Sequence, residues 1–273
     1  MKATKPLLEA SGVTVRHTLR KGLTERGQFI ALDEVSLSIW NGSTLALVGK
    51  SGSGKSTLAL CLAGLERPTS GRIFFEGADL ASLRESELRV VRPHIQLIFQ
   101  DPAAALNPRM TALEIVAEPL KLSRRMRRSE LKNCAQMLLQ RVGVSSELAV
   151  RRPAELSGGQ RQRLAIARAL ALEPKLVILD EALSALDCSV QAQITNLLLE
   201  LQDTFGLAYL FITHDMAMAA HLADEVAVID RGRIVEHGRT EDLVGYPKQE
   251  ATRALLAATP RILMPAGAIL DQS

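Results

Sequence analysis

The most constraining feature of the chain is the glycine-rich segment GKSGSGKS at residues 49–56. It follows the apolar run Leu45–Val48 and precedes a helical pattern. A turn between a strand and a helix lets backbone N–H groups converge on phosphate oxygens at the positive end of the helix. The alternative is a flexible glycine turn without function, and the strand before it and the helix after it argue against that alternative. The segment therefore predicts a phosphate-binding loop with Gly49, Ser51, Gly52, Gly54, Lys55, Ser56 and Thr57 as nucleotide-binding residues.

Short, continuous apolar runs recur along the chain with helical patterns between several of them. Such runs are typical of strands buried on both faces, and their alternation with helices predicts an α/β fold with a largely parallel sheet. The stretch Pro102–Pro153 differs, because it holds long helical patterns such as Ser129–Gly143 and few strand candidates. The predicted strands are Leu45–Val48, Ile73–Phe75, Ile95–Phe99, Leu176–Leu179, Tyr209–Ile212 and Val226–Ile229.

Composition excludes several classes of protein. The 273 residues carry 33 basic and 30 acidic side chains, a balance too mild to require a nucleic-acid partner. Cys61, Cys134 and Cys188 lie too far apart for a metal-binding pattern or a disulfide framework, and they fit a reducing cytoplasm. We find no apolar run of the roughly 20 residues that a membrane span needs, and the N-terminal MKATKPLLEA lacks the apolar core of a signal peptide. Any membrane role is therefore expected to depend on a partner.

Two adjacent carboxylates end the apolar run LVILDE at residues 176–181. Ligands of parallel sheets gather at the carboxyl ends of strands, so Asp180 is placed to hold Mg²⁺. Glu181 is then placed to polarise an attacking water. The alternative is an acidic helix start that interacts with the helix dipole. The phosphate loop in the same chain favours the catalytic interpretation.

The segment LSGGQRQR at residues 156–163 resembles the signature motif of the ABC ATPase family. The remaining family motifs, some before and some after this segment, appear in the family's order. Gln100 resembles the Q-loop glutamine, SALD at residues 184–187 resembles the D-loop, and His214 resembles the switch histidine. The resemblance extends from about Leu8 to Gly238, which is nearly the whole chain.

This resemblance implies a P-loop ATPase fold of α/β class. Its parts would be a mostly parallel core sheet, an N-terminal antiparallel β subdomain and an inserted helical subdomain. On that basis residues 1–245 are expected to form the ATPase domain, with the core at 1–100 and 160–245 and the helical insertion at 101–159. Residues 246–273 are expected to form a C-terminal extension.

The resemblance also assigns roles in the hydrolysis of ATP. Lys55, Ser56 and Thr57 would bind phosphates, and Mg²⁺ would be held by Ser56, Gln100 and Asp180. Glu181 would be the general base, with His214 and Gln100 completing the catalytic group. Ser157 and Gly159 would serve the ATP bound to the opposite subunit of a head-to-tail dimer. The further nucleotide-binding residues implied are Gly158, Gln160 and Asp187.

Two departures from the family pattern stand out. Ala182 and Leu183 follow the catalytic glutamate, where the family often has proline and threonine. The family's adenine-stacking aromatic falls near residue 17, which is histidine here. His17 is therefore the expected stacking residue, with Phe29 as a less well aligned alternative.

The segment FQDPAAALNPRMT at residues 99–111 resembles the dipeptide, oligopeptide and nickel importer branch, as does the tail with Tyr246, Pro247 and ATRALLAATP. That branch implies two permease subunits, a second and usually different ATPase subunit, and an extracytoplasmic solute-binding protein. The chain would then lie on the cytoplasmic face of a bacterial inner membrane and would not bind nucleic acid. No cysteine follows Cys188, so no iron–sulfur cluster is expected.

The cargo stays open at this point. Peptides are the first expectation, and nickel or a metal chelate the second. The rival functions are a soluble ABC ATPase that acts on nucleic acid or ribosomes, and an exporter ATPase. The FQDP and LNPRMT segments argue against the exporter.

Overall fold

The computed structural model describes residues 5–21, 25–123 and 127–259. The chain divides into two compact units. Unit 1 takes in residues 1–62, 66–81 and 211–273, and unit 2 takes in residues 63–65 and 82–210. Strand β8 (Ala208–Thr213) runs from unit 2 into unit 1. This division does not follow the expected subdomain boundaries, which stay a prediction.

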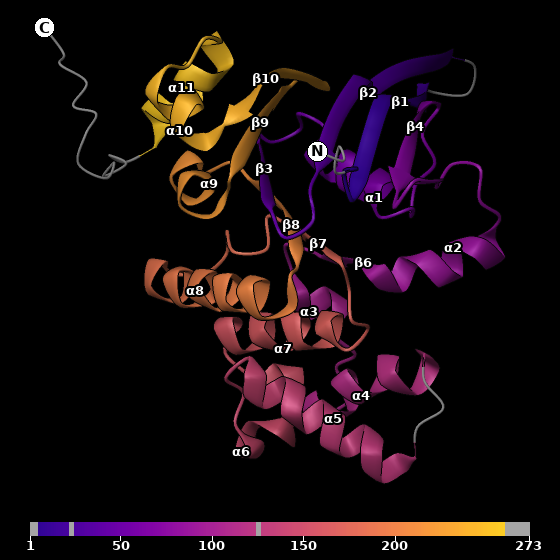
Figure 1. Cartoon of the computed structure of the whole chain (residues 1–273), viewed down its shortest axis with the longest axis vertical. Helices are drawn as coiled ribbons and strands as arrows, with labels where there is room; N and C mark the ends of the chain where they lie inside the picture. Colours follow the sequence, from indigo (N-terminus) through magenta and orange to yellow (C-terminus); the bar gives the residue numbers. More distant parts are fainter. Residues whose placement is uncertain (1–4, 22–24, 124–126, 260–273) are drawn as a thin grey trace, which may run out of the picture. The chain divides into compact units, whose positions relative to one another are not determined.

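In its described residues, unit 1 combines a four-stranded sheet with strands of the core and helices (Figure 1). Its core strand β3 (Thr44–Val48) is buried along its whole length and pairs in parallel with β9 (Glu225–Asp230). β9 in turn pairs antiparallel with β10 (Arg233–Arg239). The remaining elements of unit 1 are β1 (Leu8–Lys21), β2 (Glu25–Ile39), α1 (Lys55–Leu62), β4 (Ser70–Phe75), β5 (Ala78–Asp79), α9 (Met216–Leu222), α10 (Thr240–Gly245) and α11 (Glu250–Ala258).

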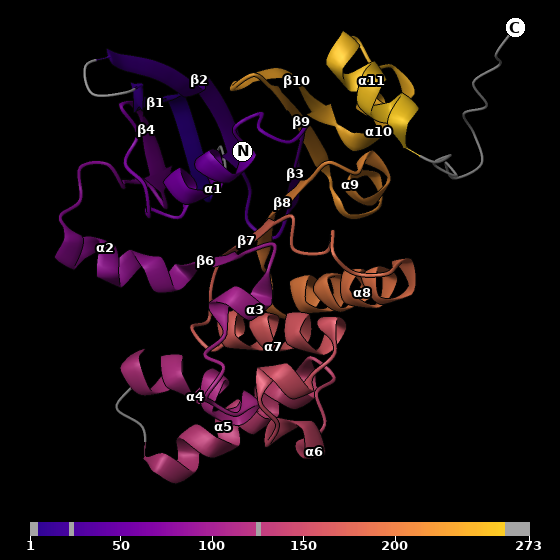
Figure 2. The same ribbon diagram turned by 180° about the vertical axis from the view of Figure 1, so that it is seen from behind.

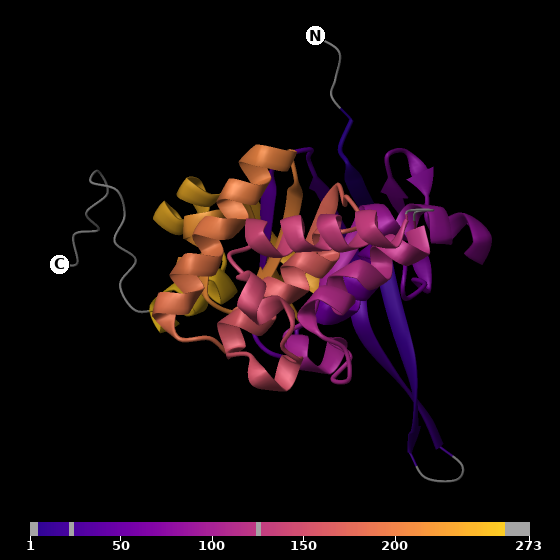
Figure 3. The same cartoon turned by 90° about the horizontal axis from the view of Figure 1, so that it is seen from below.

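The four-stranded sheet has the order β2-β1-β4-β5 and is antiparallel. β1 and β2 form a long twisted ribbon (Figure 3). β1 has no continuous apolar run, and the four-residue run Phe29–Leu32 in β2 was not selected as a strand from the sequence. The expectation that Ile73–Phe75 is buried on both faces of a parallel sheet was wrong. That segment lies in β4, which pairs antiparallel with β1 and is fully buried only at Ile73 and Phe75.

Unit 2 is dominated by helices, and its strands β6 (Ile95–Ile98) and β7 (Leu176–Asp180) pair in parallel. β6 ends one residue before the expected limit at Phe99. Helices α7 (Gly158–Leu170) and α8 (Cys188–Phe205) lie side by side (Figures 1 and 2). The other elements are α2 (Glu85–Val91), η1 (Arg92–His94), α3 (Pro102–Ala105), α4 (Ala112–Ser123), α5 (Arg128–Arg141), α6 (Ser146–Ala149) and η2 (Pro153–Glu155).

The predicted fold class is therefore confirmed, since parallel strand pairs occur in both units and the antiparallel sheet forms at the N-terminal side of the chain. The expected boundary between residues 159 and 160 falls inside the first turn of α7, because the helix begins at its cap, Ser157. Within the described residues, none of the helices has both the length and the hydropathy that a membrane crossing requires.

Tyr209 offers a direct test of how unit 2 is held together. Its side chain is almost fully buried, and its hydroxyl donates a 2.9 Å hydrogen bond to the carbonyl of Leu198 in α8. Burial also raises the pKa of the phenol, which keeps it protonated as a donor. Tyr209→Phe should lower the free energy of unfolding by about 1 kcal/mol, measured by urea denaturation. Tyr246→Phe, at an exposed tyrosine, is the matched control and should leave the midpoint unchanged.

Candidate active site

The phosphate loop occupies the space between β3 and α1 in unit 1. Two of its glycines are required by space. A Cβ on Gly49 would lie 2.4 Å from the carbonyl oxygen of Ile229, and one on Gly54 would lie 2.5 Å from that of Ala31. Gly54 also has φ +107°, a conformation that other residues rarely adopt. The loop backbone is thus fixed by its neighbours, with α1 starting at Lys55.

Lys55 lies almost fully buried inside this loop. Its Nζ donates to the carbonyl oxygens of Gly49 at 2.8 Å and Lys50 at 3.0 Å. The ammonium group is therefore held at the centre of the loop, at the N-terminus of α1. A buried cation beside a helix N-terminus is an environment suited to phosphate oxygens, because both favour negative charge.

Two neighbouring segments of unit 1 fix the loop from outside. The amide of Gly232, in the turn between β9 and β10, donates to the carbonyl of Ser53 at 2.9 Å. The amide of Gly49 donates to the carbonyl of Thr213, the residue before His214, at 3.4 Å. The structure thus brings the start of the loop beside the end of β8, and His214 is the residue that follows this strand.

His214 itself is exposed and lies just before α9. The next residue, Asp215, caps α9 by accepting hydrogen bonds from the amides of Ala217 and Met218. This cap fixes the backbone that follows the histidine.

His17 and Phe29, the two candidates for stacking on adenine, are cross-strand partners in β1 and β2. His17 Nε2 lies 3.7 Å from a carboxylate oxygen of Glu66, and the Phe29 ring is half exposed. Because the two residues are direct cross-strand neighbours, either one would place the adenine contact at the same part of the sheet.

Unit 2 brings Gln100, Asp180 and Glu181 to the carboxyl ends of β6 and β7. The register pairs Ile98 with Leu179, so both strands end at the same level. Asp180 is buried at the last position of β7. Glu181 follows with φ +47°, which costs a residue with a Cβ about 1–2 kcal/mol. Strain of this kind at the end of a buried strand is typical of functional residues.

Ser184 contacts two members of this group; the sequence analysis included it in the SALD segment but gave it no role in the site. Its hydroxyl donates to the carbonyl of Glu181 at 2.8 Å and accepts from Nε2 of Gln100 at 3.3 Å. Its place three residues after Glu181, the spacing of a tight turn, was the available signal. Ser184 therefore connects the backbone of the expected base, Glu181, to the side chain of the expected Q-loop residue, Gln100.

The signature segment forms the start of α7. Ser157 is the N-cap: its Oγ accepts from the amide of Gln160 at 3.3 Å, and Oε1 of Gln160 accepts from the amide of Ser157 at 2.9 Å. This reciprocal pair is a capping box. Asp187 is the N-cap of α8 and accepts from the amide of Val190. Its pKa is lowered by hydrogen bonds from that amide and from the hydroxyl of Ser189. These residues thus have a structural role besides the expected contact with nucleotide.

The glycines of the signature segment permit α7 and α8 to begin close together. A Cβ on Gly159 would lie 2.6 Å from Cγ1 of Val190, whereas one on Gly158 would meet Leu186 at 3.3 Å. Only the first of these distances is shorter than any real contact of a Cβ atom.

The expected site residues thus divide between the two units. Unit 1 holds the phosphate loop, His214 and the two adenine candidates, and unit 2 holds Gln100, Asp180, Glu181, the signature residues and Asp187. Each set is ordered within its own unit.

A family model described as "ABC transporter" matches residues 32–184, more than half of the chain. The chain belongs to the ABC transporter family. Among solved structures, it resembles the dimeric ATP-binding cassette MJ0796 bound to ADP and Pi, with a TM-score of 0.77 and 30% identity over 85% of this chain and 98% of that one. It also resembles cbiO1 from Clostridium perfringens, with a TM-score of 0.76 and 27% identity over 89% of this chain and 92% of that one. This ABC transporter chain is an ATPase whose hydrolysis of ATP is coupled to transport.

Relatives with curated names give similar results for this ABC transporter subunit. A probable peptide ABC transporter ATP-binding protein, y4tS of Sinorhizobium fredii, is 48% identical over 93% of this chain and 72% of that protein. The dipeptide transport ATP-binding protein DppF of Haemophilus influenzae is 44% identical over 96% of this chain and 80% of that protein. The glutathione import ATP-binding protein GsiA of Pectobacterium atrosepticum is 48% identical over 94% of this chain but only 41% of that protein.

The contact between Gly159 and Val190 predicts a specific defect. Gly159→Ala should force the starts of α7 and α8 apart and lower stability by about 1–3 kcal/mol, the usual cost of overpacking. Thermal unfolding and steady-state ATPase activity measure the effect, with Gly158→Ala as the milder neighbour. The double variant Gly159→Ala/Val190→Ala should recover most of the loss, and a double variant no better than the single one would contradict this packing account.

Proposed function

We propose that this chain is the ATP-hydrolysing subunit of a bacterial importer for peptides. The observation that carries the proposal is its similarity, over more than nine tenths of its length, to proteins named for peptide and dipeptide transport. Glutathione, the cargo in the name of a further relative, is itself a short peptide. These names favour peptides over nickel or a metal chelate. They also favour transport over action on nucleic acid or ribosomes.

For catalysis, we propose a role for each of these residues in the hydrolysis of ATP. Lys55 neutralises charge on the β- and γ-phosphates, and loop amides hold the remaining oxygens. Glu181 accepts a proton from the attacking water, and His214 contacts the γ-phosphate. His17 or its partner Phe29 stacks on adenine. Ser157–Gln160 and Asp187 act on the nucleotide of the facing subunit.

Mg²⁺ is the ion that we propose for this site. The donors expected to hold it are the hydroxyl of Ser56, the carboxylate of Asp180 and the side-chain amide of Gln100, which offer the oxygen ligands that Mg²⁺ prefers. Asp180 is buried and lies at the end of a strand, a position that suits a ligand of a small cation. Bound Mg²⁺ would neutralise charge on the phosphate oxygens.

The base role of Glu181 is tested by Glu181→Gln. The variant keeps the size of the side chain but cannot accept a proton, so ATPase turnover should fall by roughly 10²–10⁴-fold. ATP binding should persist, and the dimer should accumulate in its closed form, measured by gel filtration with ATP. Glu200→Gln, at an exposed position on α8, is the control. Normal turnover in Glu181→Gln would remove Glu181 from the base role.

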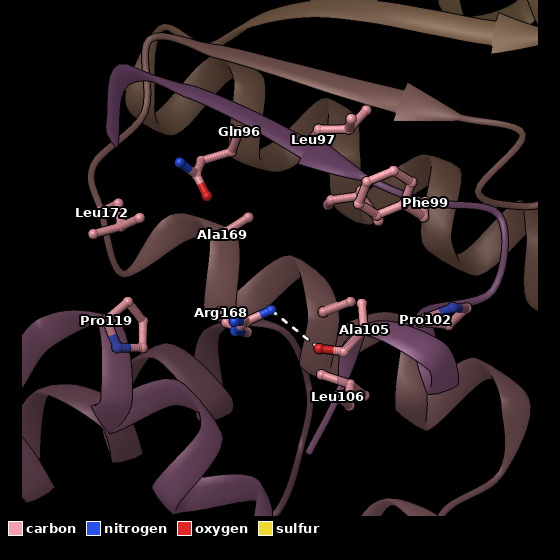
Figure 4. A pocket seen from close by; sticks show the side chains of 12 residues that line it. Gln96, Leu97, Phe99, Pro102, Ala105, Leu106, Pro119, Arg168, Ala169 and Leu172 are labelled. Atoms are coloured by element: carbon pink, nitrogen blue, oxygen red, sulfur yellow. Dashed lines mark hydrogen bonds between the residues drawn. The ribbon is translucent and has the colours of Figure 1, made fainter. Parts of the chain in front are cut away.

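We further propose that unit 2 contacts a permease through a pocket beside Gln100. The pocket has a volume of about 130 Å³ and is mainly apolar. Figure 4 shows Phe99, Leu106 and Pro119 among its lining residues, with Arg168 donating to the carbonyl of Ala105 at 3.3 Å. Phe99 immediately precedes Gln100, so an element seated here would lie next to a residue proposed to hold Mg²⁺. Two permease subunits, a second ATPase subunit and an extracytoplasmic binding protein would complete an importer on the inner membrane.

Filling the pocket tests this contact. Ala105→Trp should block it and reduce the permease recovered with the tagged chain from native membranes in mild detergent, at least fivefold. Ala104→Trp is the matched control, since Ala104 is exposed but does not line the pocket. Wild-type chain should recover two permease proteins and a second ATPase, identified by mass spectrometry. Recovery of ribosomes or nucleic acid in their place would overturn the transport proposal.

A further inference from the structure

The C-terminal helix α11 is held against β10 by one carboxylate. Glu236 of β10 accepts hydrogen bonds from the amide of Lys248 at 2.9 Å, the amide of Gln249 at 3.0 Å and the hydroxyl of Thr252 at 2.5 Å. Thr252 is completely buried. We call this arrangement the Glu236 clamp. Glu236 thus accepts from the two backbone amides just before α11 and from a hydroxyl in its first turn, so α11 cannot leave β10 without losing the acceptor of three donors.

The charge state of Glu236 suits this role. Partial burial disfavours the carboxylate, but the hydrogen bonds from Thr252, Lys248 and Gln249 outweigh that cost, so the pKa of Glu236 is lowered. The group therefore accepts all three hydrogen bonds as an anion at neutral pH. Charge-assisted hydrogen bonds of this kind are about twice as strong as neutral ones.

The same strand reaches the phosphate loop at its other end. β10 begins at Arg233, directly after Gly232, whose amide donates to the carbonyl of Ser53 in the loop. Gly232 also lies against Ala31, with its Cα 3.6 Å from the position of a Cβ on Gly54. Three residues lie between Gly232 and Glu236, so one short strand joins α11 to the loop that holds Lys55.

Hydrophobic packing forms a second connection. Leu255 of α11 belongs to a buried cluster with Ala46 and Val48 of β3 and with Met216 of α9. β3 leads into the phosphate loop, and α9 follows His214. α11 packs directly on β9, the parallel neighbour of β3, so this cluster connects α11 to β3 and α9 through close-packed side chains.

A cavity of about 520 Å³ lies between the two regions. Lys50 of the loop lines it together with Asp230 and Arg231 of the β9–β10 turn, and with Gln249 and Leu255 on the side of the C-terminal segment. The phosphate loop and the C-terminal segment therefore line the same cavity.

We propose that Glu236 and Thr252 are positioning residues for the ATPase site: by seating α11 they hold the β9–β10 turn and β3 in the arrangement that binds nucleotide. Release of α11 weakens ATP binding, and bound ATP strengthens the seat of α11. This coupling gives the C-terminal extension a role in setting nucleotide affinity. The proposal rests on the proposed role of the phosphate loop.

The first test is Thr252→Val in the full-length chain. The change keeps the volume of the buried side chain and removes only the hydroxyl that reaches Glu236. We expect the Kd for ATP, measured with a fluorescent analogue, to rise about fivefold, the lower end of typical coupling between sites. The KM for ATP should rise by a similar factor with less change in kcat. Thr252→Ser, which restores the hydroxyl, should recover affinity.

Thr259→Val is the matched control, because that hydroxyl donates to the carbonyl of Leu255 at the other end of α11 and does not reach Glu236. Glu236→Gln should repeat the effect of Thr252→Val, with Glu241→Gln on α10 as its control. Unchanged affinity in both Thr252→Val and Glu236→Gln would overturn the proposal, as would an equal loss in Thr259→Val.

A second measurement needs no variant and so is independent of folding defects. Coupling between two sites is reciprocal. If the docked α11 raises the affinity for ATP by some factor, bound ATP must stabilise the docked α11 by the same factor. Hydrogen exchange at the amides of Lys248 and Gln249 should slow about fivefold when ATP is added to the wild type. Unchanged exchange under saturating ATP would overturn the coupling. Lys55→Ala distinguishes the two proposals, since normal ATP affinity in that variant would contradict the role of the loop itself.

Discussion

The close approach of neighbouring backbone to the phosphate loop is the constraint on which unit 1 depends. The carbonyls of Ile229 and Ala31 occupy the space where Gly49 and Gly54 would carry side chains. Only glycine allows the end of β9 and the strand β2 to come this near, and their nearness fixes the loop around Lys55. The conformation of the loop is therefore fixed by strands that are distant in sequence. The glycines of the eight-residue motif leave the space that these strands occupy.

The sequence predicted the parts whose physics is local. Buried strands such as β3, β7 and β8 appear as continuous apolar runs because both faces are covered. α5 was visible from its helical period. β1 and β2 escaped the same approach, since β1 has no continuous apolar run and the run Phe29–Leu32 in β2 is exposed at Phe29 and Ile30. The register also shifts at several points along β1. β4 was seen but placed in the wrong kind of sheet, because a three-residue apolar run does not reveal the direction of its partner.

The site was predicted mostly through motifs, and the structure adds reasons that motifs do not contain. Ser157, Gln160 and Asp187 were chosen for expected contact with nucleotide, yet each also caps a helix of unit 2. Gly159 is explained by Val190, which is 31 positions further along the chain and is not part of the motif. Ser184 and the Glu236 clamp depend on contacts across turns and between strands and a helix, which pairwise spacing in the sequence does not show.

The helix caps of the signature segment have a consequence for assembly. A surface that is loose in the free subunit must lose conformational entropy when a second subunit covers it, and that loss reduces affinity. Ser157, Gln160 and Asp187 satisfy their own backbone before any partner arrives. In the proposed dimer this face is therefore already ordered when it meets its partner. Little of the free energy of ATP binding is lost to ordering this surface, and most of it favours association of the subunits.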